Sequence, residues 1–161
     1  MFFNAWASCY RAEVQAFVEH PFPMLGFGNP APFKTSDQSN AMKWLAYLFV
    51  YERDGLLHIG RAIPRAWFAQ EQAFSATRLS TPAGSVSVEY RPRRAAETIE
   101  AELALDLRTK PRIVRLRFRH PDRKPIRSVV INGRASRAFA ADSGDVELPP
   151  VSGTTQVTVN Y

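Results

Sequence analysis

Two stretches in the first third of the chain repeat apolar residues at steps of three and four, which is the period of an amphipathic helix. The first runs from Phe2 to Val18 and carries an aromatic stripe. The second begins at Thr35-Ser36-Asp37-Gln38, which has the form of a capping box, and it ends at Arg53-Asp54-Gly55. A segment rich in Gly and Pro separates them. This pattern predicts a helical hairpin over residues 1–55.

After Gly55 the period falls to two. Seven short stretches alternate apolar and polar residues between turns rich in Gly, Pro and Asn: 57–59, 86–90, 99–107, 114–118, 128–132, 145–148 and 156–161. Such stretches predict an antiparallel β-sandwich. The charge changes at the same place, since residues 1–56 hold four Lys/Arg against five Asp/Glu and the rest hold seventeen against ten. We therefore predict a mainly β chain with two domains, the helical hairpin at 1–55 and the antiparallel β-sandwich at 56–161.

One strand pairing follows from the residues on either side of Thr109 and Lys110. With these two residues at a hairpin tip, apolar residues face each other on one side of the sheet and Glu faces Arg on the other. The pairs are Leu105–Val114, Leu103–Leu116, Ala101–Phe118, Glu102–Arg117 and Glu100–Arg119. This register predicts a hairpin and makes the arginines a solvated face with cross-strand ion pairs.

The net charge of +6 raises the question of a nucleic-acid partner. The glutamates opposite the arginines argue against one, and the chain has no RNA-binding signature or zinc-finger spacing. No apolar run reaches the roughly 18 residues of a membrane span, so we predict no membrane partner. The N-terminus lacks the basic region of a secretory signal, which leaves the cytoplasm as the default location. The single Cys9 excludes an intramolecular disulfide.

Motifs for catalysis or cofactor binding are not evident. His20, His58 and His120 lack the spacing of metal ligands, and the GxSxG, phosphate-loop and dinucleotide patterns do not occur. We therefore predict no metal and no cofactor. Asn132-Gly133 predicts a hairpin turn in which both residues have positive φ.

Two residues remain as candidate site residues. Trp67 follows the Pro64-Arg65 turn, and its ring would complement the C–H face of a pyranose, so it is the candidate carbohydrate-binding residue. Asp37 lies at a helix start, where the helix macrodipole stabilises a carboxylate. A catalytic role is the alternative interpretation of Asp37.

The segment from Ser36 to Phe68 resembles the end of bacterial glycoside hydrolases with a six-hairpin (α/α) toroid. Residues 53–67, Arg-Asp-Gly-Leu-Leu-His-Ile-Gly-Arg-Ala-Ile-Pro-Arg-Ala-Trp, are similar to the pattern DGxxHLxxAxPxxW, which joins the last barrel helix to a C-terminal β-sandwich. His120-Pro121, residues 130–133 and residues 157–161 also resemble that sandwich.

The resemblance implies that the catalytic toroid lies almost wholly upstream of Met1. It also makes Asp37 the closest match to an acidic residue that fucosidase-like members carry before their last barrel helix. Their Asp-Gly-Asn is Asp37-Gln38-Ser39 in this chain. Glycoside hydrolysis needs two carboxylates, and no second one is identified.

We therefore expect a non-catalytic C-terminal module of a glycoside hydrolase-like enzyme, which supports the toroid and is not active alone. One alternative is a self-standing carbohydrate-binding β-sandwich that uses Trp67; the other is a structural or oligomerising module. The two aromatic helix stripes cannot bury each other completely. The expected partners are therefore the missing toroid or a second copy in a homo-oligomer, with carbohydrate as a further candidate.

Overall fold

The computed structural model describes residues 9–11, 15–17, 35–149 and 153–161, and the chain divides into two units at residues 1–46 and 47–161. In the first unit β1 (Tyr10–Arg11) pairs antiparallel with β2 (Ala16–Phe17). The predicted helix over residues 2–18 is therefore wrong at these positions. Gln15 has a φ of 50° and turns the chain where a helix would continue. The rest of that predicted helix lies outside the described residues.

The second predicted helix is present as α2 (Thr35–Phe49), but it ends four residues earlier than Arg53. Strand β3 (Val50–Arg53) follows at once. Its Val50-Tyr51 start favours a strand, because β-branched and aromatic side chains pack well on a pleated sheet. The sandwich unit therefore begins before the predicted boundary at Leu56, and it includes the last turn of α2, residues 47–49.

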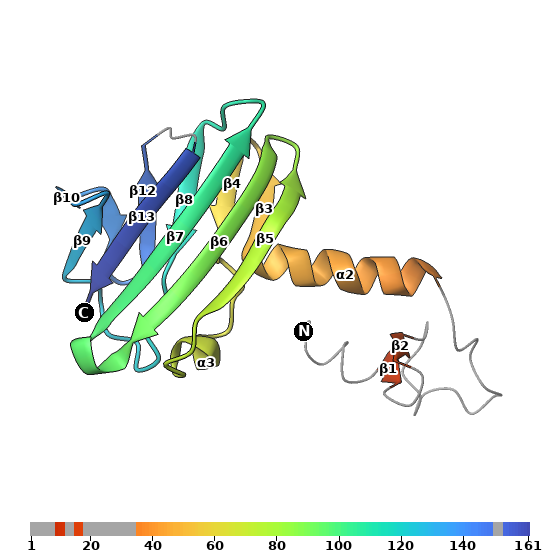
Figure 1. The fold of residues 1–161 in the computed structure, drawn as a ribbon, viewed down its shortest axis with the longest axis horizontal. Helices are drawn as coiled ribbons and strands as arrows, with labels where there is room; N and C mark the ends of the chain where they lie inside the picture. The colour runs from red at the N-terminus through yellow and green to blue at the C-terminus, as the bar shows by residue number, and fades with distance from the viewer. Residues whose placement is uncertain (1–8, 12–14, 18–34, 150–152) are drawn as a thin grey trace. The chain divides into compact units, whose positions relative to one another are not determined.

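The second unit is a β-sandwich of two facing sheets (Figure 1). One sheet has the strand order β10-β9-β13-β7-β6-β5, and the other has the order β11-β12-β8-β4-β3. The other strands are β4 (Leu56–Ile59), β5 (Phe74–Thr81), β6 (Gly84–Arg93), β7 (Thr98–Leu107), β8 (Ile113–Arg117), β9 (Ser128–Ile131), β10 (Arg134–Ser136), β11 (Phe139–Ala140), β12 (Asp145–Leu148) and β13 (Gly153–Asn160). A short helix α3 (Arg65–Phe68) and a 3₁₀ turn η2 (Arg94–Ala96) connect strands. The predicted mainly β architecture with an antiparallel sandwich is confirmed, and of the predicted helical hairpin before it the described residues hold the second helix, α2.

Strands β7 and β8 do not form the predicted hairpin. β7 pairs with β6 and β13, whereas β8 pairs with β12 and β4 in the other sheet. The predicted buried face is correct, because Leu103 and Leu116 are both fully buried. A period of two specifies the buried face of a strand and leaves its neighbour open. Accordingly Glu102 pairs with Arg91, and Arg117 pairs with Asp145.

Among the described strands, β4 and β8 form the one parallel pair, with Ile59 opposite Leu116. Gly60 follows β4 with a φ of 73°, and its N–H donates to the carbonyl oxygen of Phe49 at 2.6 Å. A Cβ atom at this position would lie 2.0 Å from Oη of Tyr90. Both the backbone angle and the close approach therefore require glycine.

An aromatic cluster packs within the core beside Gly60. Oη of Tyr90 donates to the carbonyl oxygen of Arg117 at 3.1 Å. The Tyr90 ring lies 5.3 Å from Phe68, 5.3 Å from Phe74 and 5.8 Å from Phe118, measured between centroids. Phe68 belongs to α3 and Phe74 to β5, and Phe118 directly follows β8. Burial of each large apolar side chain stabilises the fold by about 1.5–3 kcal/mol, so this cluster helps to hold the two sheets together.

The predicted Asn132-Gly133 turn is confirmed. The two residues have φ angles of 48° and 77° and join β9 to β10, with Arg134 opposite Ile131. Two consecutive positive φ angles match the right-handed twist of the paired strands.

Gly60→Ala is expected to lower the free energy of unfolding by roughly 3–5 kcal/mol, because the new methyl group adds a clash to the strain of a positive φ. Gly133 is the control: a Cβ there would meet no atom within 4 Å. Gly133→Ala should therefore cost only about 1–2 kcal/mol. Urea unfolding followed by tryptophan fluorescence measures both. Equal losses in the two variants would contradict the role given to Gly60.

Candidate functional site

Asp37, the predicted catalytic residue, lies in the first turn of α2. Its backbone is helical, and its side chain lies outside what the structure describes. A catalytic role for Asp37 therefore stays a prediction.

Trp67, the predicted carbohydrate-binding residue, lies in α3 and is partly buried. Its ring contacts Phe49 at 5.9 Å and Phe74 at 5.6 Å, measured between centroids. The side chain thus packs the end of α2 against the edge of the six-stranded sheet. Its role in carbohydrate binding stays a prediction. The sequence did not predict its packing role, because its partners come from other elements of the fold.

The two described histidines, His58 and His120, contact neighbouring residues of the fold. His58 on β4 is 8% exposed and stacks on Tyr51 at 4.7 Å between ring centroids. Burial lowers the pKa of His58, and the nearby charge of Arg61 lowers it further. Burial also lowers the pKa of His120, whose Nδ1 accepts a hydrogen bond from the backbone N–H of Asp122 at 3.1 Å. His20 lies outside the described residues.

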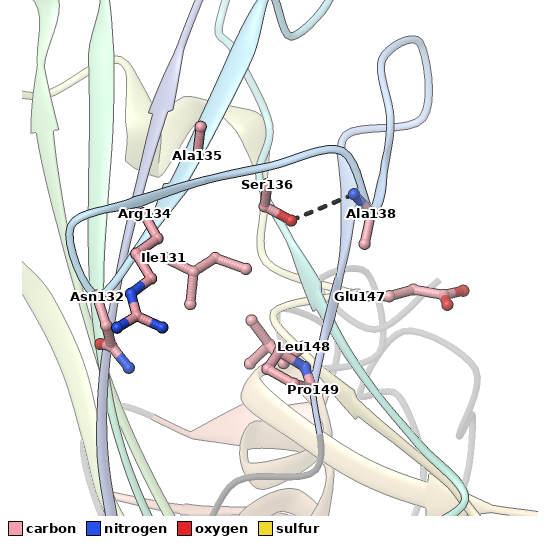
Figure 2. Close-up of a pocket in the computed structure, with 9 residues that line it drawn as sticks. All are labelled: Ile131, Asn132, Arg134, Ala135, Ser136, Ala138, Glu147, Leu148 and Pro149. Atoms are coloured by element: carbon pink, nitrogen blue, oxygen red, sulfur yellow. Dashed lines mark hydrogen bonds between the residues drawn. The ribbon is translucent and has the colours of Figure 1, made fainter.

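A cavity of about 730 Å³ opens between the edges of the two sheets (Figure 2). The β9–β10 hairpin and the following connection form one side, and the end of β12 forms the other. Ile131 and Leu148 lie between Arg134 on one side and Glu147 on the other. Asn132, Ala135, Ser136, Ala138 and Pro149 complete the lining. Its volume lies in the range of pockets that bind small molecules.

The polar groups of this cavity are held in place by the backbone around them. Oδ1 of Asn132 accepts a hydrogen bond from the backbone N–H of Gln156 at 2.8 Å. Oγ of Ser136 accepts from the Ala138 amide at 3.2 Å, the dashed line in Figure 2. The Glu147 amide donates to the Ala138 carbonyl oxygen at 2.8 Å, which joins the connection to β12. Preorganised groups of this kind suit the binding of a polar ligand.

A second cavity of about 450 Å³ adjoins the first, since Ala138 and Glu147 line both. Its other lining residues are Arg115, Arg137, Phe139, Ala140 and Asp145. The sequence predicted the Asn132-Gly133 turn beside the first cavity but neither cavity. The short strands β10 and β11, which line them, carry too few residues to show a period.

Arginines bind carboxylates on both outer faces of the sandwich. Arg117 holds Asp145 through two hydrogen bonds of 2.6 and 2.9 Å. The other pairs are Arg115–Glu147, Arg91–Glu89, Arg91–Glu102 and Arg93–Glu100. Glu147 is the one carboxylate that lines the first cavity, and Arg115 binds it at 2.6 Å. The residues that line the first cavity therefore do not include the second carboxylate that glycoside hydrolysis needs.

Within the described ranges, no group of three or more His, Cys, Asp or Glu residues is placed to hold a metal ion. None of the helices in the part of the chain that the structure describes is long and apolar enough to cross a membrane.

Comparison with known proteins adds no relative: no family model matches the chain, and no curated protein matches its sequence. The resemblance of residues 53–67 to glycoside hydrolases therefore stays an expectation.

The ion pair between Arg117 and Asp145 should stabilise the fold more than the pairs on the six-stranded sheet. Its side chains are 17% and 15% exposed, against 56% and 42% for Arg93 and Glu100. Asp145→Asn should lower the free energy of unfolding by about 2–3 kcal/mol, since it leaves a guanidinium largely buried without its counter-charge. Glu100→Gln is the matched control, at about 0–1 kcal/mol. The midpoints of urea unfolding compare the two, and similar losses would refute this ranking.

Proposed function

We propose that the chain is a non-catalytic C-terminal module of a glycoside hydrolase-like, carbohydrate-active enzyme. In this proposal the β-sandwich is built onto the last helix of a helical catalytic domain and supports it. The observation that carries the proposal is the junction between α2 and β3, where helix and sheet join without a linker. The resemblance of residues 53–67 to the junction in six-hairpin enzymes agrees with it.

The last turn of α2 packs as part of the sandwich. Leu48 is 5% exposed and Val50 is 2% exposed, so both sides of the junction are buried. The Phe49 ring contacts Trp67, and the Phe49 carbonyl oxygen accepts the Gly60 amide at 2.6 Å. Helix and sheet therefore share side-chain packing and a backbone hydrogen bond.

This junction favours a supporting role over that of a tethered binding module. Modules that act independently are commonly joined by exposed, flexible linkers rich in Pro, Gly or polar residues. Here the last turn of α2, residues 47–49, belongs to the sandwich unit, and β3 follows it directly. A helical domain that ends in such a helix would share its last turn with the sandwich, which is the property expected of a supporting module.

Carbohydrate binding by the sandwich itself is a second candidate function, favoured by the cavity of about 730 Å³ at the sheet edges. Arg134, Ser136 and Glu147 would supply donors and acceptors for hydroxyl groups. In this case the ligand would bind in the cavity lined by residues between 131 and 149, and Trp67 is not among these residues.

The isolated chain should not hydrolyse a panel of aryl glycosides above the buffer rate, and Asp37→Asn should leave that result unchanged. Hydrolysis that Asp37→Asn abolishes would overturn the supporting-module proposal. Calorimetric titration with neutral saccharides separates the second candidate. Binding that Arg134→Ala weakens at least tenfold, with Arg108→Ala as the control at another exposed site, would favour the binding module over the supporting one.

A further inference from the structure

The parallel pairing of β4 with β8 brings arginines together from two distant segments. Because the strands are parallel, their carboxyl ends lie at the same edge of the sheet, with Ile59 opposite Leu116. The chain after β4 carries Arg61 and Arg65, and the chain after β8 carries Arg119. We refer to Arg61, Arg65 and Arg119 as the arginine cluster.

Hydrogen bonds connect these segments directly. Nη2 of Arg119 donates to the carbonyl oxygen of Arg61 at 2.7 Å. Nη1 of Arg65 donates to the carbonyl oxygen of His120 at 2.6 Å. Both acceptors are backbone carbonyls, so they orient the guanidinium groups without neutralising their charge.

The arginine cluster has an excess of positive charge. None of its three members forms an ion pair with a carboxylate among the described residues. Asp145 is the carboxylate whose charge acts on Arg119, and it is already bound by Arg117 through two hydrogen bonds. Oγ of Ser143 also donates to Asp145, at 3.1 Å.

Burial lowers the pKa of Arg119, and the charges of Arg117, Arg65 and Arg61 lower it further. Like charges repel one another, and a bound anion would relieve the repulsion.

Arg119 also has a hydrogen-bond donor for which the described part of the chain offers no acceptor. Its Nε is buried, and it has no partner among the residues that the structure describes. A guanidinium presents its donors in a planar fork that matches the oxygens of a carboxylate, sulfate or phosphate. Because Nε is buried, an anion from solvent would be met by the η nitrogens of Arg119, which share the same charge.

The size of the charged region favours a small ligand over a nucleic acid. Nucleic acids are bound through an extended row of cations that contact successive phosphates. Along β8 such a row is interrupted, since Glu147 neutralises Arg115 and Asp145 neutralises Arg117. The arginine cluster lies beyond this row, at the carboxyl ends of β4 and β8.

We propose that the arginine cluster binds an oxyanion at the carboxyl ends of β4 and β8. The group recognised is a carboxylate, sulfate or phosphate, either as a free ion or as the acidic substituent of a saccharide. This inference does not depend on the proposed supporting function, and a failure of either leaves the other in place.

The test is calorimetric titration of the whole chain with sulfate, phosphate, D-glucuronate and glucose 6-sulfate, at an ionic strength fixed with sodium chloride. At least one of these anions should bind, and Arg61→Gln and Arg119→Gln should each weaken its binding tenfold or more. Arg108→Gln removes the same charge from an exposed site away from the cluster and should bind like the wild type. Preference for glucuronate or glucose 6-sulfate would identify a saccharide as the source, and preference for sulfate or phosphate a free ion.

Arg61 has an exposed side chain, so Arg61→Gln keeps the test valid even if Arg119→Gln does not fold. Equal affinity in Arg61→Gln, Arg108→Gln and the wild type would overturn the proposal. So would the absence of binding by all four anions. A single-stranded DNA oligomer forms the last arm: tighter binding of the oligomer, lost in Arg61→Gln, would replace the small oxyanion with a nucleic acid.

Discussion

The sandwich depends on the close packing at Gly60, the residue that follows β4. The amide of this residue is bound by Phe49 at the end of α2, and its Cα lies beneath the hydroxyl group of Tyr90. The same hydroxyl group donates to the carbonyl oxygen of Arg117 at the end of β8. One residue without a side chain thus connects the helix end, the aromatic cluster and the parallel strand pair.

Two functional features follow from this arrangement. The parallel ends of β4 and β8 place Arg61 and Arg119 beside each other, although they are far apart in sequence. The bond from Gly60 to Phe49 makes the end of α2 a part of the sandwich. The anion site and the supporting role that we propose therefore share a structural origin, although they are tested separately.

The sequence predicted faces and turns better than it predicted neighbours. Alternation along 99–107 and 114–118 identifies Leu103 and Leu116 as buried, because burial follows directly from the pleat. The Asn132-Gly133 turn was predictable because few residues accept its backbone angles. The partner of β8 was not, since Glu and Arg are common on outer faces and many registers give plausible ion pairs.

The candidate sites were harder to predict for the same reason. Trp67 looked available for a sugar because its partners Phe49 and Phe74 come from other elements. The parallel pairing of β4 with β8 links residues more than fifty positions apart, and local pattern carries no information on such a contact. The arginine cluster and the cavity at the sheet edges both arise from contacts of this kind.

Native-state hydrogen exchange at the Gly60 amide tests the central claim, that the end of α2 is part of the sandwich. The Gly60 amide hydrogen should exchange only through global unfolding, with the same free energy and denaturant dependence as the central amides of β8. The reason is that its acceptor, the carbonyl oxygen of Phe49, is held by the core. Exchange at a much lower free energy, independent of denaturant, would contradict the account. It would mean that the helix end separates from the sheet while the sandwich stays folded.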